Sequence, residues 1–168
     1  MLIGSFLRSL YLLLIFSIYL SQVSSTFGPC VYNNGDYSAL SYIELSDPIN
    51  GVPFYVLPCG SLGSIGSNIP LSCYNYSACE DHTLLSFFYP NHIQYSYLNQ
   101  NPTSGIQMVL PSTKSSISVT LNIWCSSNES APKIPTLNTW VESGVTNFWV
   151  VAGDAVACYN PVTGKNRY

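Results

Sequence analysis

The sequence predicts an all-β fold, a flattened β-barrel or sandwich of two antiparallel sheets that disulfides hold together, and three observations predict it. Beyond residue 25 the chain is rich in Tyr, Ser, Asn, Val and Ile and poor in Ala, Glu and Lys, a composition that favours strands and turns over helices. Proline and glycine divide the chain into short apolar segments. The six cysteines form an even set, which is typical of a disulfide framework.

The clearest predicted strand is Ile117–Cys125, where apolar residues at odd positions alternate with Ser, Thr and Asn as far as Trp124. This period of two is typical of a strand with one buried face. Seven shorter segments, bounded by Pro, Gly or Asn, are also expected to be strands: 42–45, 54–57, 84–88, 93–97, 106–110, 148–152 and 155–158. Segment 128–138 is expected to be a loop. Eight short strands at this spacing favour a sandwich or barrel.

Residues 1–25 have the pattern of a secretory signal peptide. One basic residue, Arg8, precedes an apolar run over 10–20, and small polar residues end at Ser25, after which we expect cleavage. The apolar run is shorter than the roughly 20 residues that a membrane-spanning helix needs. The mature chain is therefore expected to have no membrane span, and retention of the segment as an uncleaved anchor is the alternative.

The remaining 143 residues suit one domain, which we place at 26–160, followed by a polar C-terminal tail at 161–168. This mature part carries four basic and eight acidic residues, a net charge of −4. Because nucleic-acid binding needs clustered Lys and Arg, we expect no nucleic-acid partner. Two glycosylation sequons, at Asn75 and Asn128, agree with passage through the secretory pathway. We expect the protein to be secreted or to reside in the lumen of the secretory or endolysosomal pathway.

The cysteines and aromatic residues stand in an ordered framework. In chain order it consists of Cys30, Tyr55-Val56-Leu57-Pro58-Cys59-Gly60, Cys73 with Ala78-Cys79, Ile123-Trp124-Cys125, Phe148-Trp149-Val150 and Val156-Ala157-Cys158. This framework resembles the mannose 6-phosphate receptor homology (MRH) domain, from Cys30 to Cys158. The resemblance implies a flattened β-barrel of two sheets that cross at a large angle, in a lectin for mannose-containing N-glycans.

The resemblance also implies three disulfides, Cys30–Cys59, Cys73–Cys79 and Cys125–Cys158, whereas the sequence alone leaves fifteen connectivities open. A further cysteine pair that is frequent in the family is missing here, and both of its members are missing together. The missing bridge pins a binding loop in the family, so that loop is expected to be less constrained in this chain.

In the family, four side chains hold the sugar: a Gln directly after the second cysteine of the loop pair, an Arg before the Cys-terminated strand, a Glu before the last strand and a Tyr on it. The positions of the Gln, Arg and Tyr hold Glu80, Ile117 and Phe148 here, and the cation nearest to the Arg position is Lys114. Glu142 stands in for the Glu, but its spacing from Cys158 differs from the family pattern. None of the four matches residue for residue. Because phosphate recognition needs cations, we do not expect mannose 6-phosphate to bind.

A neutral mannose or another N-glycan, free or on a glycoprotein, is the expected ligand, held by Glu80, Lys114, Glu142 and Trp149. The alternative interpretation treats the three charged residues as solvated loop residues and Trp149 as an ordinary strand residue. The domain is then a protein-interaction or structural module without a sugar site. A secreted β-sandwich unrelated to the family is a third possibility.

No enzymatic, metal or cofactor function is expected. The chain has no nucleophile signature of the Gly-x-Ser-x-Gly type near a histidine. Segment 79–82, Cys-Glu-Asp-His, holds metal-ligating residue types, but its cysteine is expected to be oxidised. The glycine-rich segment 60–66 lacks the Lys of a phosphate-binding loop.

Overall fold

A computed structural model describes residues 30–66, 68–128, 131–160 and 165–166. The predicted signal peptide and its cleavage position lie outside the described residues. Of the predicted polar tail, the structure describes Lys165–Asn166, which form strand β13 and pair with β12 (Tyr159–Asn160).

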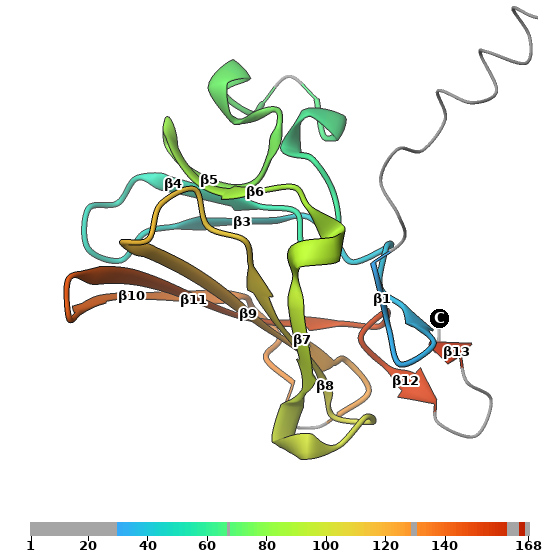
Figure 1. The fold of residues 1–168 in the computed structure, drawn as a ribbon. Helices are drawn as coiled ribbons and strands as arrows, with labels where there is room; N and C mark the ends of the chain where they lie inside the picture. The colour runs from blue at the N-terminus through green and yellow to red at the C-terminus, as the bar shows by residue number, and fades with distance from the viewer. Residues whose placement is uncertain (1–29, 67, 129–130, 161–164, 167–168) are drawn as a thin grey trace, which may run out of the picture.

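Two main sheets face each other (Figure 1). The four-stranded sheet has the order β3-β4-β5-β6, with β3 at Ile43–Ser46, β4 at Pro53–Val56, β5 at Tyr76–Glu80 and β6 at Thr83–Phe87. The five-stranded sheet has the order β10-β11-β9-β8-β7, with β7 at Gln94–Tyr97, β8 at Gly105–Leu110, β9 at Ile117–Cys125, β10 at Thr136–Glu142 and β11 at Val145–Asp154. The predicted all-β, two-sheet fold is confirmed, although the sheets do not close into a barrel.

Short elements complete the chain. They are the hairpin of β1 (Val31–Tyr32) and β2 (Gly35–Asp36), and the 3-10 helices η1 (Leu62–Ser64), η2 (Leu71–Cys73), η3 (Pro90–His92) and η4 (Leu98–Gln100). The loop that carries η1 and η2 packs on the four-stranded sheet from the side opposite to the five-stranded sheet (Figure 1). There Leu62, Ile69 and the Cys73–Cys79 disulfide form a small second core with Tyr55.

The main core lies between the two sheets. In β9 the apolar residues Val119, Leu121 and Ile123, at odd positions, are at most 1% exposed, as the period of two predicts. Phe148 of β11 stacks on Phe54 of β4, with ring centroids 5.6 Å apart, and this contact joins the sheets. Side chains that alternate with these residues therefore point away from the sandwich.

The five-stranded sheet contains one parallel pair, which differs from the expected purely antiparallel arrangement. Strands β9 and β11 run parallel from Thr146 opposite Ile117 to Asp154 opposite Cys125. Parallel neighbours need a crossover connection, and here it contains β10, which then pairs antiparallel with β11.

The structure has three disulfides, Cys30–Cys59, Cys73–Cys79 and Cys125–Cys158, in the pairing that the MRH resemblance implies, and all six cysteines are used. Such bridges are typical of proteins that fold in an oxidising extracellular or lumenal compartment. Cys125 ends β9 and Cys158 follows β11, so this bridge ties the two parallel strands together at one end.

Seven of the eight predicted strands correspond to strands of the structure, namely β3, β4, β6, β7, β8, β9 and β11. The eighth prediction, 155–158, is wrong. The Asp154 carboxylate accepts a hydrogen bond from the Val156 N–H at 2.8 Å, and the Cys158 N–H donates to the Ala155 carbonyl at 3.0 Å. These local bonds make the segment a turn. The predicted loop 128–138 is also wrong from Thr136 onward, where β10 begins.

Candidate functional site

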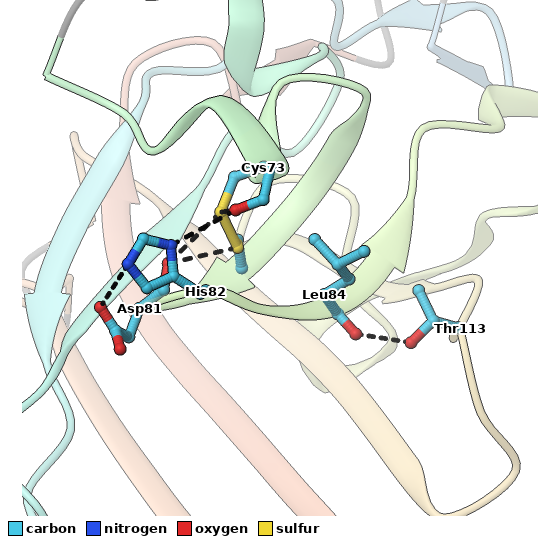
Figure 2. Close-up of a disulfide and its surroundings, with 7 residues drawn as sticks. Cys73, Asp81, His82, Leu84 and Thr113 are labelled. Carbon is cyan, nitrogen blue, oxygen red and sulfur yellow. Dashed lines mark hydrogen bonds and ion pairs between the residues drawn. A yellow bond between two sulfur atoms is a disulfide. The ribbon is translucent and has the colours of Figure 1, made fainter.

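Glu80 is positioned by the end of a hairpin. It is the last residue of β5, and the turn Asp81–His82 leads into β6. Figure 2 shows that the Cys73–Cys79 disulfide lies against this turn, with the sulfur of Cys73 3.4 Å from the Asp81 carbonyl oxygen. The disulfide thus fixes the turn, and with it the direction in which Glu80 leaves the strand.

A cluster of polar side chains surrounds Glu80 at the rim of the two sheets. Asp47, which directly follows β3, is only 2% exposed. Its carboxylate accepts hydrogen bonds from the Ile49 N–H at 2.6 Å and from the Thr139 hydroxyl of β10 at 2.8 Å. The side chains of Asp47 and Glu80 share a further hydrogen bond. The cluster therefore links the four-stranded sheet to the edge strand β10 of the five-stranded sheet.

The carboxyl groups of Glu80 and Asp47 have pKa values that are shifted in opposite directions. Burial, followed by the hydrogen bond with Asp47 and its negative charge, raises the pKa of Glu80 to about 7. Burial alone would also raise the pKa of Asp47, but its hydrogen bonds from Ile49, Thr139 and Glu80 outweigh burial and lower it. Below neutral pH, Glu80 is thus a neutral acid that donates to the Asp47 carboxylate.

Phe148, at the position of the family's Tyr, belongs to the main core. Only 4% of it is exposed, and its ring stacks on the fully buried Phe54. Ile117, at the position of the family's Arg, packs against the same core. These two positions hold apolar side chains that fill the space between the sheets.

The other face of the five-stranded sheet carries aromatic and polar side chains. We call the outer face the surface formed by Thr136, Asn138, Trp140, Glu142, Asn147, Trp149, Val151, Ser118, Thr120, Asn122, Gln107, Val109, Gln94 and Ser96, which the strand register places on one side. Phe148 of β11 points into the core, so its neighbours along the strand, Asn147 and Trp149, point to the opposite side of the sheet. In Figure 1 this side of the sheet faces away from the four-stranded sheet.

Two tryptophans lie together near one end of the outer face. The ring centroids of Trp140 on β10 and Trp149 on β11 are 6.3 Å apart, with the ring planes tilted by 51°. Trp140 is 39% exposed, and Asn138, directly opposite Trp149 in the register, is exposed as well. An indole pair with an adjacent amide offers a ligand both an apolar surface and hydrogen-bonding groups.

A row of hydrogen-bonded side chains crosses the middle of the outer face. The Ser96 hydroxyl donates to the Gln107 side-chain carbonyl at 3.2 Å, and the Gln107 amide nitrogen donates to the Asn122 carbonyl oxygen at 2.9 Å. These bonds fix the orientation of the amides on neighbouring strands, and Asn122 at the end of the row is only 7% exposed.

The structure separates the four predicted ligand residues. Trp149 and Glu142 both belong to the outer face, whereas Glu80 lies at the rim of the two sheets with Asp47. Lys114 is exposed in the loop before β9, where its carbonyl accepts a hydrogen bond from the Ile117 N–H. The structure thus brings Glu142 and Trp149 to one surface and leaves Glu80 outside it.

Sequence reasoning missed Asp47, Thr139 and Trp140. The contact of Asp47 with Thr139 joins residues 92 positions apart, so no local pattern indicates it. Trp140 carried a usable signal, since Leu137, Thr139 and Val141 alternate with Asn138, Trp140 and Glu142. The prolines before this segment favoured a loop instead.

Among the described residues, no helix is both long and apolar enough to cross a bilayer. In the same residues, no three His, Cys, Asp or Glu side chains are grouped as a metal site. Cys79 of the Cys-Glu-Asp-His segment is in a disulfide. No family model, curated protein or solved structure matches the chain.

Proposed function

We propose that this protein is a non-enzymatic binding module of the secretory pathway, with an MRH-like domain, that recognises neutral N-glycans or glycoproteins through its outer face. The observation that carries the proposal is the Trp140–Trp149 pair, flanked by Asn138 and Asn147 on adjacent strands. A pyranose ring has an apolar face of C–H groups that packs on an indole, and its hydroxyl groups need both donors and acceptors. The side-chain amides supply both.

The charge of the surface favours a neutral ligand. Glu142, at the end of β10, is the one charged residue among those that form the outer face. A phosphorylated or carboxylated sugar requires a cation, best supplied as the fork of an arginine. Neutral hexoses and N-acetylhexosamines fit this surface without such a partner.

The apolar rim of β10 favours a second candidate function, protein interaction. Strand β10 is an edge strand, and Val141 on it and Ile134 just before it are 70% and 75% exposed. An exposed edge with apolar side chains is a common place for another chain to add a strand. In this case the domain retains the MRH-like fold, and its partner is a polypeptide.

A glycan array probed with the secreted, disulfide-bonded protein tests the first proposal. We expect retention of neutral N-glycans, and an approximately tenfold weaker affinity for Trp140→Ala, in line with the loss of one stacking aromatic side chain. Leu71→Ala is the control, because Leu71 is an exposed apolar residue, 79% against 39% for Trp140, and lies in η2, away from the outer face.

The outcomes separate the candidate functions. Array signals at background level overturn glycan binding. A Trp140→Ala variant that binds glycans as tightly as the wild type shows that the sugar site lies elsewhere. Loss of a protein partner in a Val141→Asp variant, with an empty array, favours the interaction module instead.

A further inference from the structure

A second surface feature lies on the four-stranded sheet, at the start of β5 and the end of β6. It is a groove of about 330 Å³, lined by Ser61, Asn75, Tyr76, Phe87, Phe88 and Tyr89. Its volume is near the lower limit of ligand pockets, which is about 300 Å³. None of the residues that line it belongs to the outer face.

Aromatic rings build the wall of this groove. Tyr76 and Phe87, directly opposite each other in the register, have ring centroids 5.1 Å apart, and Tyr89 follows at 5.5 Å from Phe87. The backbone holds this arrangement, since the Phe87 N–H donates to the Pro111 carbonyl at 3.1 Å. The rings are thus ordered by the protein itself, and Tyr89 remains 49% exposed.

Asn75 stands in this groove and is also the acceptor of a glycosylation sequon, Asn75-Tyr76-Ser77. Its side chain is exposed, whereas Ser77 is 1% exposed. Burial of Ser77 in the folded protein does not prevent modification, because transfer takes place on the chain before this segment folds. A sugar on Asn75 then begins beside the aromatic wall.

We propose that the glycan on Asn75 folds back into this groove and that its first N-acetylglucosamine packs against Tyr76, Phe87 and Tyr89. The covalent tether gives this sugar a high effective concentration at the groove, so it outcompetes free ligands. The apolar face of the sugar covers rings that otherwise contact water. The groove is therefore a binding site for the protein's own glycan, and the bound glycan stabilises the fold.

The attachment step is ordinary glycosyl transfer and needs only the secretory pathway. The Asn75 side-chain nitrogen forms a bond to C1 of the sugar, while the bond between C1 and the phosphate oxygen of a lipid-linked sugar diphosphate breaks. The lipid diphosphate leaves, and the amide loses one proton. The inference depends on entry into this pathway and is independent of glycan recognition by the outer face.

The test uses the full chain secreted from a eukaryotic host that makes high-mannose glycans, with mass spectrometry to report occupancy of Asn75. Two treatments follow: an endoglycosidase that leaves one N-acetylglucosamine, and an amidase that removes the whole glycan. We expect the melting temperature to be unchanged by the first treatment and to fall by about 3 °C after the second. A Ser130→Ala variant, which removes the other sequon, controls for a glycan on Asn128.

A Tyr89→Ser background makes the test specific to the groove. In that background we expect removal of the whole glycan by the amidase to change the melting temperature by no more than about 1 °C, because the sugar then lacks part of the aromatic wall on which it packs. An unoccupied Asn75 in the folded, secreted protein overturns the inference. So does a melting temperature that is insensitive to the amidase, or an equal loss with and without Tyr89.

Discussion

At the scale of single residues, Glu80 shows how one position changes its role with its surroundings. The MRH resemblance places it where a sugar-binding Gln stands in the family, but here its carboxyl group is hydrogen-bonded to Asp47. One of its oxygens, Oε1, is buried and accepts no hydrogen bond within the described part of the protein. A buried oxygen that accepts no hydrogen bond disfavours the ionised form of Glu80, which agrees with the raised pKa of this group.

The stability of the protein is therefore expected to depend on pH. A carboxyl group whose pKa is higher in the folded than in the unfolded chain contributes stability that is complete below its ordinary value of 4.5 and is lost as the pH rises through about 7. These two pKa values correspond to about 2 kcal/mol between pH 5.5 and pH 8.5, and solvent screening of this partly exposed group reduces the effect to roughly 1 kcal/mol. We therefore expect the melting temperature to fall by about 4 °C over this range. Differential scanning calorimetry measures it.

A Glu80→Gln variant tests the cause. The Gln amide donates to Asp47 as the protonated acid does, but it does not titrate. We expect this variant to melt at the same temperature at both pH values and above the wild type at pH 8.5. Glu142→Gln, at an exposed carboxylate on β10, is the control and should retain the dependence of the wild type. If the melting temperature of Glu80→Gln falls with pH as steeply as that of the wild type, Glu80 is not the group that causes the pH dependence.

The sequence predicted the position of Glu80 through the family resemblance, but it did not predict its partner. Asp47 precedes Pro48 in the turn after β3, where its carboxylate accepts hydrogen bonds from the Ile49 and Asn50 N–H groups. Its contacts with Glu80 and Thr139 come from two other strands. Contacts of this kind depend on the sheet arrangement, which local patterns do not encode.

At the scale of elements, the structure explains which strands were predictable. Strand β9 lies in the middle of its sheet, and its apolar residues at odd positions alternate with polar ones as far as Asn122, so its period of two is clear in the sequence. Strand β5 consists of Tyr-Ser-Ala-Cys-Glu, whose small residues have weak strand preference, so it is absent from the predicted strands. Strand β10 is an edge strand with exposed residues, so burial does not reinforce its alternation.

The contact between β8 and β9 depends on the glycine at the start of β8. Gly105 has φ +132°, and a Cβ there would lie 2.3 Å from the Ile123 carbonyl oxygen. Both the dihedral angle and the overlap exclude a larger residue. We expect Gly105→Ala to lower the free energy of unfolding by at least about 3 kcal/mol, as measured by urea denaturation.

Gly51, in the turn between β3 and β4, is the matched control for this substitution. It also has a positive φ, +72°, but nothing lies within 4 Å of an added Cβ. Gly51→Ala therefore tests only the cost of a positive φ for alanine, and we expect it to lower the free energy of unfolding by about 1 kcal/mol. Similar losses at both glycines contradict the role of the close β8–β9 approach.

At the scale of the whole molecule, two sheets, a covering loop and a parallel strand pair are held by bridges of very different span. Cys125 and Cys158 are separated by 33 residues, and Cys73 and Cys79 by 6. The sequence indicated that disulfides form, because the cysteine number is even, while the pairing came from the family resemblance alone. Connectivity follows from the fold, since it depends on which strand ends are neighbours.

The unequal spans predict unequal contributions to stability. A bridge mainly restricts the unfolded chain, so its contribution grows with the loop that it closes, to about 4 kcal/mol for the longer span and about 2 kcal/mol for the shorter one. All four cysteines are buried, so replacing either pair with alanine removes similar packing, and the difference between the two variants isolates the loop effect. Urea denaturation should therefore find Cys125→Ala/Cys158→Ala less stable than Cys73→Ala/Cys79→Ala by roughly 1 to 2 kcal/mol. If the short-span variant is instead the less stable one, the Cys73–Cys79 bridge acts chiefly in the folded state, by holding the β5–β6 turn against which it lies.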